Sequence, residues 1–206
     1  MTNSTHEDGA ARTAGIPGKR ERLAAAARQL LYTQGIEKTT IADIASAADI
    51  SIGNLYYYFK TKDGLVSAAI ELHAQNLRDT IASLEEHHRA PQARLKALVR
   101  GWVDQRELTA QYGCPFGTLA SELDKRTDSL DRQAAKVMLL LIDWAEQQFQ
   151  SMGRTDAREL AVALIAAYQG ISLLTNTLRD PALMTIEGRR LERWIDLLSS
   201  KAPAGS

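Results

Sequence analysis

The chain has a single cysteine among 206 residues, Cys114, which excludes a framework of internal disulfides and fits a reducing compartment. No uninterrupted apolar run approaches the roughly 20 residues that a membrane-spanning helix needs. Residues 1–20 also lack the apolar core of a signal peptide. We therefore expect a cytoplasmic protein that makes no contact with a membrane.

Signatures of catalysis are missing as well. The sequence contains no H-E-x-x-H, no G-x-S-x-G and no phosphate-binding glycine loop, and its one cysteine and four histidines form no nucleophile–base pair. The adjacent His87 and His88 would point to different faces of a helix, which is poor geometry for a metal. We expect no enzyme activity, no metal site and no cofactor.

Signals for β-sheet are also absent, because no segment alternates apolar and polar residues and no hairpin turn is evident. The five prolines all fall between helical patterns or near the ends of the chain. The pattern predicts an all-α fold of about nine helices. Two of them lie within residues 40–59, and the others cover residues 19–34, 62–87, 91–111, 116–123, 129–152, 156–179 and 186–199.

Charge is balanced overall but not along the chain. The formal net charge is zero, yet residues 1–62 hold eight Lys and Arg against six Asp and Glu. Four of these cations lie at or just before the first predicted helix, at Arg12, Lys19, Arg20 and Arg22. Such a cluster is found on solvated helix ends, and it is also typical of an arm that faces nucleic acid.

The most informative segment runs from Thr39 to Asp63 and predicts two short helices around a tight turn. Thr40 can cap the first helix, with Asp43 adding negative charge in its first turn. Residues 48–50 are too few for anything but a turn, and Ser51 offers a cap for the second helix. This is the pattern of a helix-turn-helix.

A helical wheel of the second helix, taken with Leu55 inward, separates two faces. Residues Ser51, Ile52, Tyr58 and Phe59 fall within roughly 60° of Leu55. Gly53 and Tyr57 point outward, with Asn54 and Tyr56 on the flanks. An outward face of one glycine, one amide and two phenols suits base edges and phosphates better than plain solvent. For Tyr58 and Phe59 the wheel favours a buried cluster.

The residues T-I-A-D-I-A at 40–45, S-I-G-N-L-Y-Y-Y at 51–58 and F-K-T-K-D at 59–63, with Leu65, resemble the DNA-binding signature of TetR-family transcriptional regulators. The resemblance is strong from Lys19 to about Leu72. It implies an all-helical homodimer with an N-terminal DNA-binding domain and a C-terminal domain that binds an effector. The implied contacts are phosphates for Thr40, Tyr57, Tyr58 and Lys62, and bases or backbone for Gly53, Asn54 and Tyr56. Ser51 completes the predicted DNA-binding set.

We expect four segments on this basis: a mobile tail at 1–18, the DNA-binding domain at 19–62, the effector-binding and dimerisation domain at 63–201, and a C-terminal tail at 202–206. Predicted helix 156–179 is apolar on more than one face, and predicted helix 186–199 carries one apolar stripe with arginines opposite. Together they suit a four-helix interface across a two-fold axis. An ordinary monomeric core is the alternative. The predicted interface residues are Tyr168, Ile171, Leu178, Leu191, Trp194, Ile195 and Leu198.

The segment G-C-P-F-G-T-L at 113–119 opens a short helix. The longer string G-C-P-F-G-T-L-A-S-E-L resembles that of a subset of the family related to LmrA and YxaF, which implies a drug-like or aromatic effector. Candidate pocket residues are Trp102, Phe116, Leu119, Trp144 and Tyr168, each with a plain core interpretation beside it. Cys114 is either a redox sensor or a packed thiol, and His73 either bonds an effector or faces solvent.

These patterns favour a ligand-responsive repressor that binds a palindromic DNA operator as a homodimer and is released by a small apolar or aromatic effector. Helix 62–87 would connect the two functions, because it begins at the phosphate contact and enters the effector domain. One alternative is a regulator that senses oxidants or electrophiles through Cys114. Another is a helical adaptor without DNA binding, which would leave the outward face of residues 53–57 unexplained.

Overall fold

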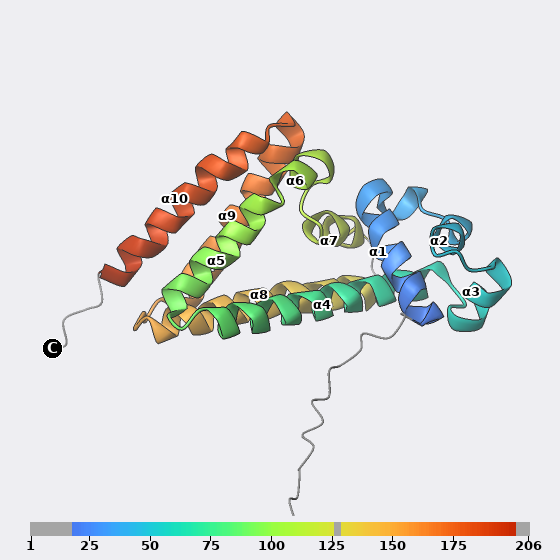
Figure 1. Cartoon of the computed structure of the whole chain (residues 1–206), viewed down its shortest axis with the longest axis horizontal. Helices are drawn as coiled ribbons and strands as arrows, with labels where there is room; N and C mark the ends of the chain where they lie inside the picture. The colour runs from blue at the N-terminus through green and yellow to red at the C-terminus, as the bar shows by residue number, and fades with distance from the viewer. Residues whose placement is uncertain (1–17, 126–128, 201–206) are drawn as a thin grey trace, which may run out of the picture.

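The computed structural model describes residues 18–125 and 129–200 (Figure 1). Within these ranges the chain forms ten helices and no strand, so the all-α prediction is confirmed. The predicted tails, apart from Gly18, and Arg12 lie outside the described residues. The helices are α1 (Lys19–Lys38), α2 (Ile41–Ala47), α3 (Ile52–Tyr58), α4 (Lys62–His87), α5 (Pro91–Asp104), α6 (Arg106–Tyr112), α7 (Gly117–Leu123), α8 (Ser129–Ser151), α9 (Ala157–Leu178) and α10 (Pro181–Ser200).

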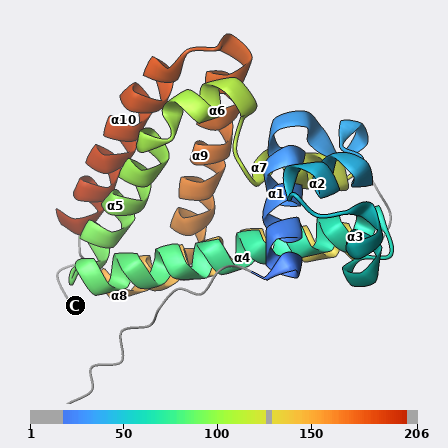
Figure 2. The ribbon, with the colours of Figure 1, turned by 45° about the vertical axis from the view of Figure 1, so that its right-hand side comes forward.

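Two long helices form the base of the molecule. Figure 2 shows α4 and α8 side by side, with α5, α9 and α10 rising from one end and α1 to α3 clustered at the other. The bounds of α4 match the prediction. Its start is set by Thr61, whose side-chain oxygen accepts a hydrogen bond from the backbone N–H of Gly64 (3.1 Å).

The helix predicted over residues 91–111 is two helices, because Gln105 (φ −92°, ψ 10°) leaves the helical region between α5 and α6. α10 begins at Pro181, five residues before the predicted start, since proline is tolerated in the first turn of a helix. α1 is interrupted at Gly35 (φ 82°, ψ 170°) and then continues to Lys38. The helix predicted to end at residue 34 therefore continues beyond a kink at Gly35, where the backbone conformation favours glycine.

The helices enclose two apolar cores. The first contains Leu23, Ala27 and Leu31 of α1, packed with Leu55 of α3 and Leu65 of α4. It extends to Leu119 and Leu123 of α7 and to the first turns of α8. The second core surrounds Phe149, Leu164 and Ile195 at the other end of the molecule. The helix α7 therefore packs at the same end of the fold as α1 to α3.

Among the described helices, α9 is long and apolar enough, by length and composition, to cross a membrane. It packs against α8, α6 and α10, and Ala161 and Leu164 are fully buried by these neighbours. These contacts are those of a core helix in a folded domain.

Candidate DNA-binding surface and effector cavity

Hydrogen bonds fix both the start of α2 and the turn between α2 and α3. The Oγ1 atom of Thr40 accepts from the backbone N–H of Asp43 (3.1 Å) and donates to its carboxylate (2.7 Å). The carboxylate also accepts from the backbone N–H of Thr40, and these bonds lower the pKa of Asp43, the side-chain bond contributing most. Asp49 takes the left-handed conformation (φ 52°) that the tight turn requires. Arg22 of α1 donates to the carbonyls of Ala48 (2.5 Å) and Asp49 (3.3 Å).

The helix α3 presents the predicted outward face to solvent. Leu55 is fully buried and anchors the helix, while Gly53 and Asn54 are exposed and Tyr57 is 76% exposed. Nothing lies within 4 Å of the position that a Cβ atom of Gly53 would take, so this side is open to a close partner. The Oγ atom of Ser51 accepts from the backbone N–H of Asn54 (3.4 Å), as expected of an N-cap.

The wheel misplaces two residues of α3. Ile52 is 47% exposed and Tyr58 is 38% exposed, although both were expected on the inward side. Both residues lie at the ends of a helix of only seven residues, and both side chains are exposed there. Phe59 is buried as predicted, with the guanidinium of Arg20 5.2 Å from the centre of its ring. The rings of Tyr57 and Tyr58 meet edge to face at 5.1 Å.

Two lysines lie beside this face. The ammonium of Lys60 donates to the carbonyl of Tyr56 (2.7 Å), and that of Lys62 donates to the carbonyl of Glu37 (3.4 Å). Each bond uses one of three N–H donors, so both groups can still bind a phosphate. The contact to Glu37 places Lys62 beside the end of α1.

A cavity of about 410 Å³ lies among α4, α5, α8 and α9, next to the loop at residues 114–116. Trp102 and Tyr168 line it with stacked rings, their centres 4.0 Å apart and their planes 15° apart. Phe116 lines it from the loop and meets the ring of His73 edge to face at 5.4 Å. Three of the predicted aromatic residues therefore come together around one cavity.

Two other predicted pocket residues lie elsewhere. Leu119 is buried in the first core, where α7 packs against α1. Trp144 lies beyond the cavity along α8, and its Nε1 atom donates to the carboxylate of Glu85 on α4 (3.0 Å). Neither side chain lines the cavity. Their spacing in the sequence carried no information about which side of the helix the cavity would occupy.

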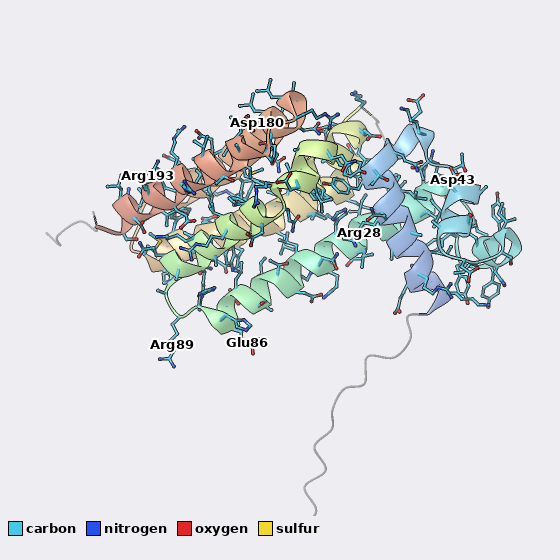
Figure 3. All side chains as sticks on the ribbon, turned by 45° about the horizontal axis from the view of Figure 1, so that its top comes forward. Arg28, Asp43, Glu86, Arg89, Asp180 and Arg193 are labelled. Carbon is cyan, nitrogen blue, oxygen red and sulfur yellow. The ribbon has the colours of Figure 1, made fainter. Side chains whose placement is uncertain are left out.

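The cavity also has polar walls. His73 faces it from α4, and burial, followed by the positive charge of Arg28, lowers the pKa of His73 to about 4. The histidine is therefore neutral near pH 7. Arg28 reaches the cavity from α1, and Figure 3 shows it on the side of α1 away from Asp43. The sequence analysis did not identify Arg28 as a cavity residue, because its contact with the cavity depends on how α1 packs against α4.

Cys114 is a buried thiol at the edge of the same cavity. Its Sγ atom accepts a hydrogen bond from the backbone N–H of Gly117 (3.2 Å) and lies 3.7 Å from the side-chain nitrogen of Gln169. Burial, followed by the neighbouring Cys114, raises the pKa of Tyr168 above its usual value. The thiol is packed, and it also borders the space that a ligand would occupy.

Hydrogen bonds connect α1 to α6, to the residue before the cavity loop and to α7. The hydroxyl of Tyr32 donates to the carbonyls of Gly113 (3.0 Å) and Leu108 (3.2 Å). The carboxylate of Glu122 on α7 accepts from the backbone N–H of Ile36 (2.6 Å), just after the kink in α1. A displacement of the loop or of α7 would therefore act directly on the helix that leads into α2.

The predicted interface residues divide into two groups. Tyr168, Ile171, Leu191 and Ile195 are buried inside the protomer, and Trp194 and Leu198 are half-buried against the same core, whereas Leu178 is 63% exposed. Exposed small and apolar residues form a stripe along α9. This stripe consists of Val162, Ala163, Ala166, Gly170, Leu173, Leu174 and Leu178. Ile186 and Leu197 are exposed on the neighbouring α10.

Comparisons with known proteins agree with this arrangement. Residues 23–69 match the family model described as bacterial regulatory proteins, tetR family, and residues 91–187 match a tetracyclin repressor-like C-terminal domain. The transcriptional regulator TtgR of Pseudomonas putida is 27% identical, over 86% of this chain and 88% of that protein. A regulator from the lacX 3′ region of Lactococcus lactis is 29% identical, over 78% of this chain and 85% of that protein.

The fold is shared with solved structures as well. A TetR transcriptional regulator from Legionella pneumophila superposes with a TM-score of 0.77 at 23% identity, covering 88% of this chain and 97% of that one. The two family models together span both ends of the molecule, the capped helix-turn-helix and the helices around the cavity. The chain belongs to the TetR family of bacterial transcriptional regulators.

Proposed function

We propose that this regulator is a homodimeric repressor that binds a palindromic operator and leaves it when a small molecule with an aromatic or apolar body occupies the cavity. The observation that carries the proposal is the exposed face of α3, capped by Ser51, together with a cavity that is lined by residues of α4 and by Arg28 of α1. A regulator of this kind acts in the cytoplasm, on the chromosome.

The proposed roles at the DNA follow from exposure and chemistry. The amide of Asn54 can pair with both polar atoms of an adenine edge, and Gly53 allows the backbone of α3 to approach the groove. Tyr56 lies beside them. Five further residues are proposed phosphate contacts, because their hydroxyl or ammonium groups lie around the ends of α2 and α3: Thr40, Ser51, Tyr57, Tyr58 and Lys62.

The proposed dimer seam is the stripe on α9 together with the exposed side of α10. Small residues at Ala166 and Gly170 allow a second helix to approach closely, and no charged residue lies on α9 beyond Glu159. Dimer formation would bury the exposed side chains of Leu173, Leu174 and Leu178. Ile195 and the other buried residues of the predicted set support this surface from behind. We assign residues 63–201 to effector binding and dimerisation on this basis.

The proposed response to an effector is a shift between two conformations. A ligand can release the operator only if it binds more tightly to a state whose two α3 helices are wrongly spaced for DNA. The cavity is lined by α4, which leads to Lys62 at its other end, and by the loop that precedes α7. A change in the cavity could therefore reach the helix-turn-helix through α4 or through the loop and α7.

The test begins by selecting preferred duplexes from a random pool with the full chain. We expect an imperfect palindrome, protected symmetrically in a footprint, because a two-fold dimer presents α3 twice. Binding measured by fluorescence anisotropy should weaken linearly with the logarithm of salt concentration. Protection of one asymmetric half-site by a monomer, or salt-independent binding, would contradict the proposal.

A second candidate is a regulator that responds to oxidants through Cys114, and the position of the thiol at the cavity wall favours it. Cys114→Ser separates the two mechanisms. Under the cavity mechanism the variant still releases DNA when an apolar ligand binds, and it loses only release caused by peroxide. If the folded, operator-binding variant loses every response, the thiol is the sensor.

A further inference from the structure

The charges around the cavity are of one sign. Arg28 is the sole ionised side chain among the described residues that line it, and no aspartate or glutamate is among them. His73, next to Arg28, is neutral near pH 7. The remaining polar side chains on the wall are neutral amides and hydroxyls, such as Asn76, Gln105 and Gln169. A bound cation would therefore face a positive charge with no carboxylate to neutralise it.

Arg28 also lacks a partner for part of its side chain. Its Nε atom is buried and has no hydrogen-bond acceptor within the described part of the chain. Buried donors are nearly always paired, and a guanidinium is shaped to bind a carboxylate through two parallel bonds. In a regulator whose cavity takes a ligand, the missing acceptor is one that the ligand can supply.

The apolar part of the cavity lies against this charge. Trp102 and Tyr168 form one stacked pair, and Phe116 contributes a third ring from the loop beside His73. A volume of about 410 Å³ suits a small organic molecule of one or two rings. The lining can therefore hold the rings of a flat apolar molecule, and Arg28 can pair with a single anionic group on it.

We propose that the effector is an aromatic carboxylate, held with its rings among Trp102, Phe116 and Tyr168 and with its carboxylate on Arg28. This deepens the proposed function and rests on it. Arg28 belongs to α1, whereas the three rings belong to α5, the loop before α7 and α9. A bound anion would therefore draw α1 towards the effector domain. The ligand would then bind more tightly to that conformation than to the one that fits DNA, which is what release of DNA requires.

The test compares three probes of the same shape by isothermal titration of the full chain: 2-naphthoate, 2-naphthamide and 2-naphthylmethylammonium. We expect naphthoate to bind at least about tenfold more tightly than the amide, and the cation more weakly than the amide, because a charge-assisted pair is worth roughly that factor. Equal binding of naphthoate and the amide, tighter binding of the cation, or binding of no probe would overturn the proposal.

Variants then assign the effect to Arg28. Arg28→Met should lower naphthoate affinity at least about tenfold and leave naphthamide affinity within about twofold. The matched control is Arg78→Met, which removes the same charge from an exposed position of α4 outside the cavity and should change neither. Arg28→Lys keeps the charge and should keep the preference for naphthoate over the amide. An unchanged naphthoate affinity in Arg28→Met, or an equal loss in Arg78→Met, would overturn the assignment.

Operator binding without any probe is measured separately on the wild-type chain. Failure there would contradict the proposed function, whatever the titrations show. A wild type that binds the operator but shows no preference for naphthoate would contradict only the proposed class of effector.

Discussion

Replacing Glu122 with alanine should destabilise the protein and loosen the contact between α7, the helix that follows the cavity loop, and α1. The carboxylate of Glu122 accepts a hydrogen bond of 2.6 Å from the backbone N–H of Ile36. That N–H follows the kink at Gly35, where the non-helical backbone interrupts the regular helical bonding pattern. The substitution removes the carboxylate and leaves the partly buried N–H of Ile36 without its acceptor. Hydrogen bonds to charged groups contribute about 1.5–3 kcal/mol, so we expect a loss of that size in the free energy of unfolding.

Urea denaturation followed by circular dichroism measures this loss, provided that the slope of the transition is unchanged. Glu122→Gln retains an uncharged acceptor and should lose less than the alanine variant. Ser121→Ala is the control, because Ser121 is exposed on the same helix and surface changes usually stay within about 0.5 kcal/mol. Glu122→Ala should also weaken the effect of ligand on operator affinity. A stability of Glu122→Ala equal to that of Ser121→Ala would refute the reasoning.

Asn54→Ala should relax sequence preference by about 1–3 kcal/mol at one base pair per half-site, whereas Lys62→Ala should weaken all duplexes alike and reduce the salt dependence. Competition binding decides this, and an equal loss for specific and non-specific DNA in both variants would contradict the assignment. Leu174→Asp should dissociate the dimer in light scattering, since an unpaired buried charge costs about 3–5 kcal/mol, while Leu108→Asp on α6, also an exposed leucine, should not. Finally, burial lowers the pKa of His73 from 6.5 to about 4, so the unfolded chain takes up a proton first as pH falls. The contribution of His73 to the free energy of unfolding is complete above pH 6.5 and falls by at most roughly 3 kcal/mol as the pH is lowered to 4. His73→Leu should remove this part of the pH dependence, measured by denaturation at several pH values.

The sequence by itself determined the helix-turn-helix, because its signals are local. The caps at Thr40 and Ser51 each accept a hydrogen bond from the backbone N–H three residues further on, as the sequence pattern predicted. The bounds of α4 and the exposure of Gly53 and Asn54 follow from the same short-range pattern. The wheel failed at Ser51, Ile52 and Tyr58, which lie at the two ends of a helix of seven residues and are exposed.

Tertiary packing alone decided the cavity and its connection to the DNA-binding end. Trp102 and Trp144 look alike in the sequence, yet only the first faces the cavity, because the rotation of α8 against α4 places Trp144 beside Glu85. Arg28 and His73 are 45 positions apart and meet only where α1 crosses α4. The bond from Ile36 to Glu122 spans 86 residues. Contacts of this range depend on how whole helices pack, and no local periodicity encodes them.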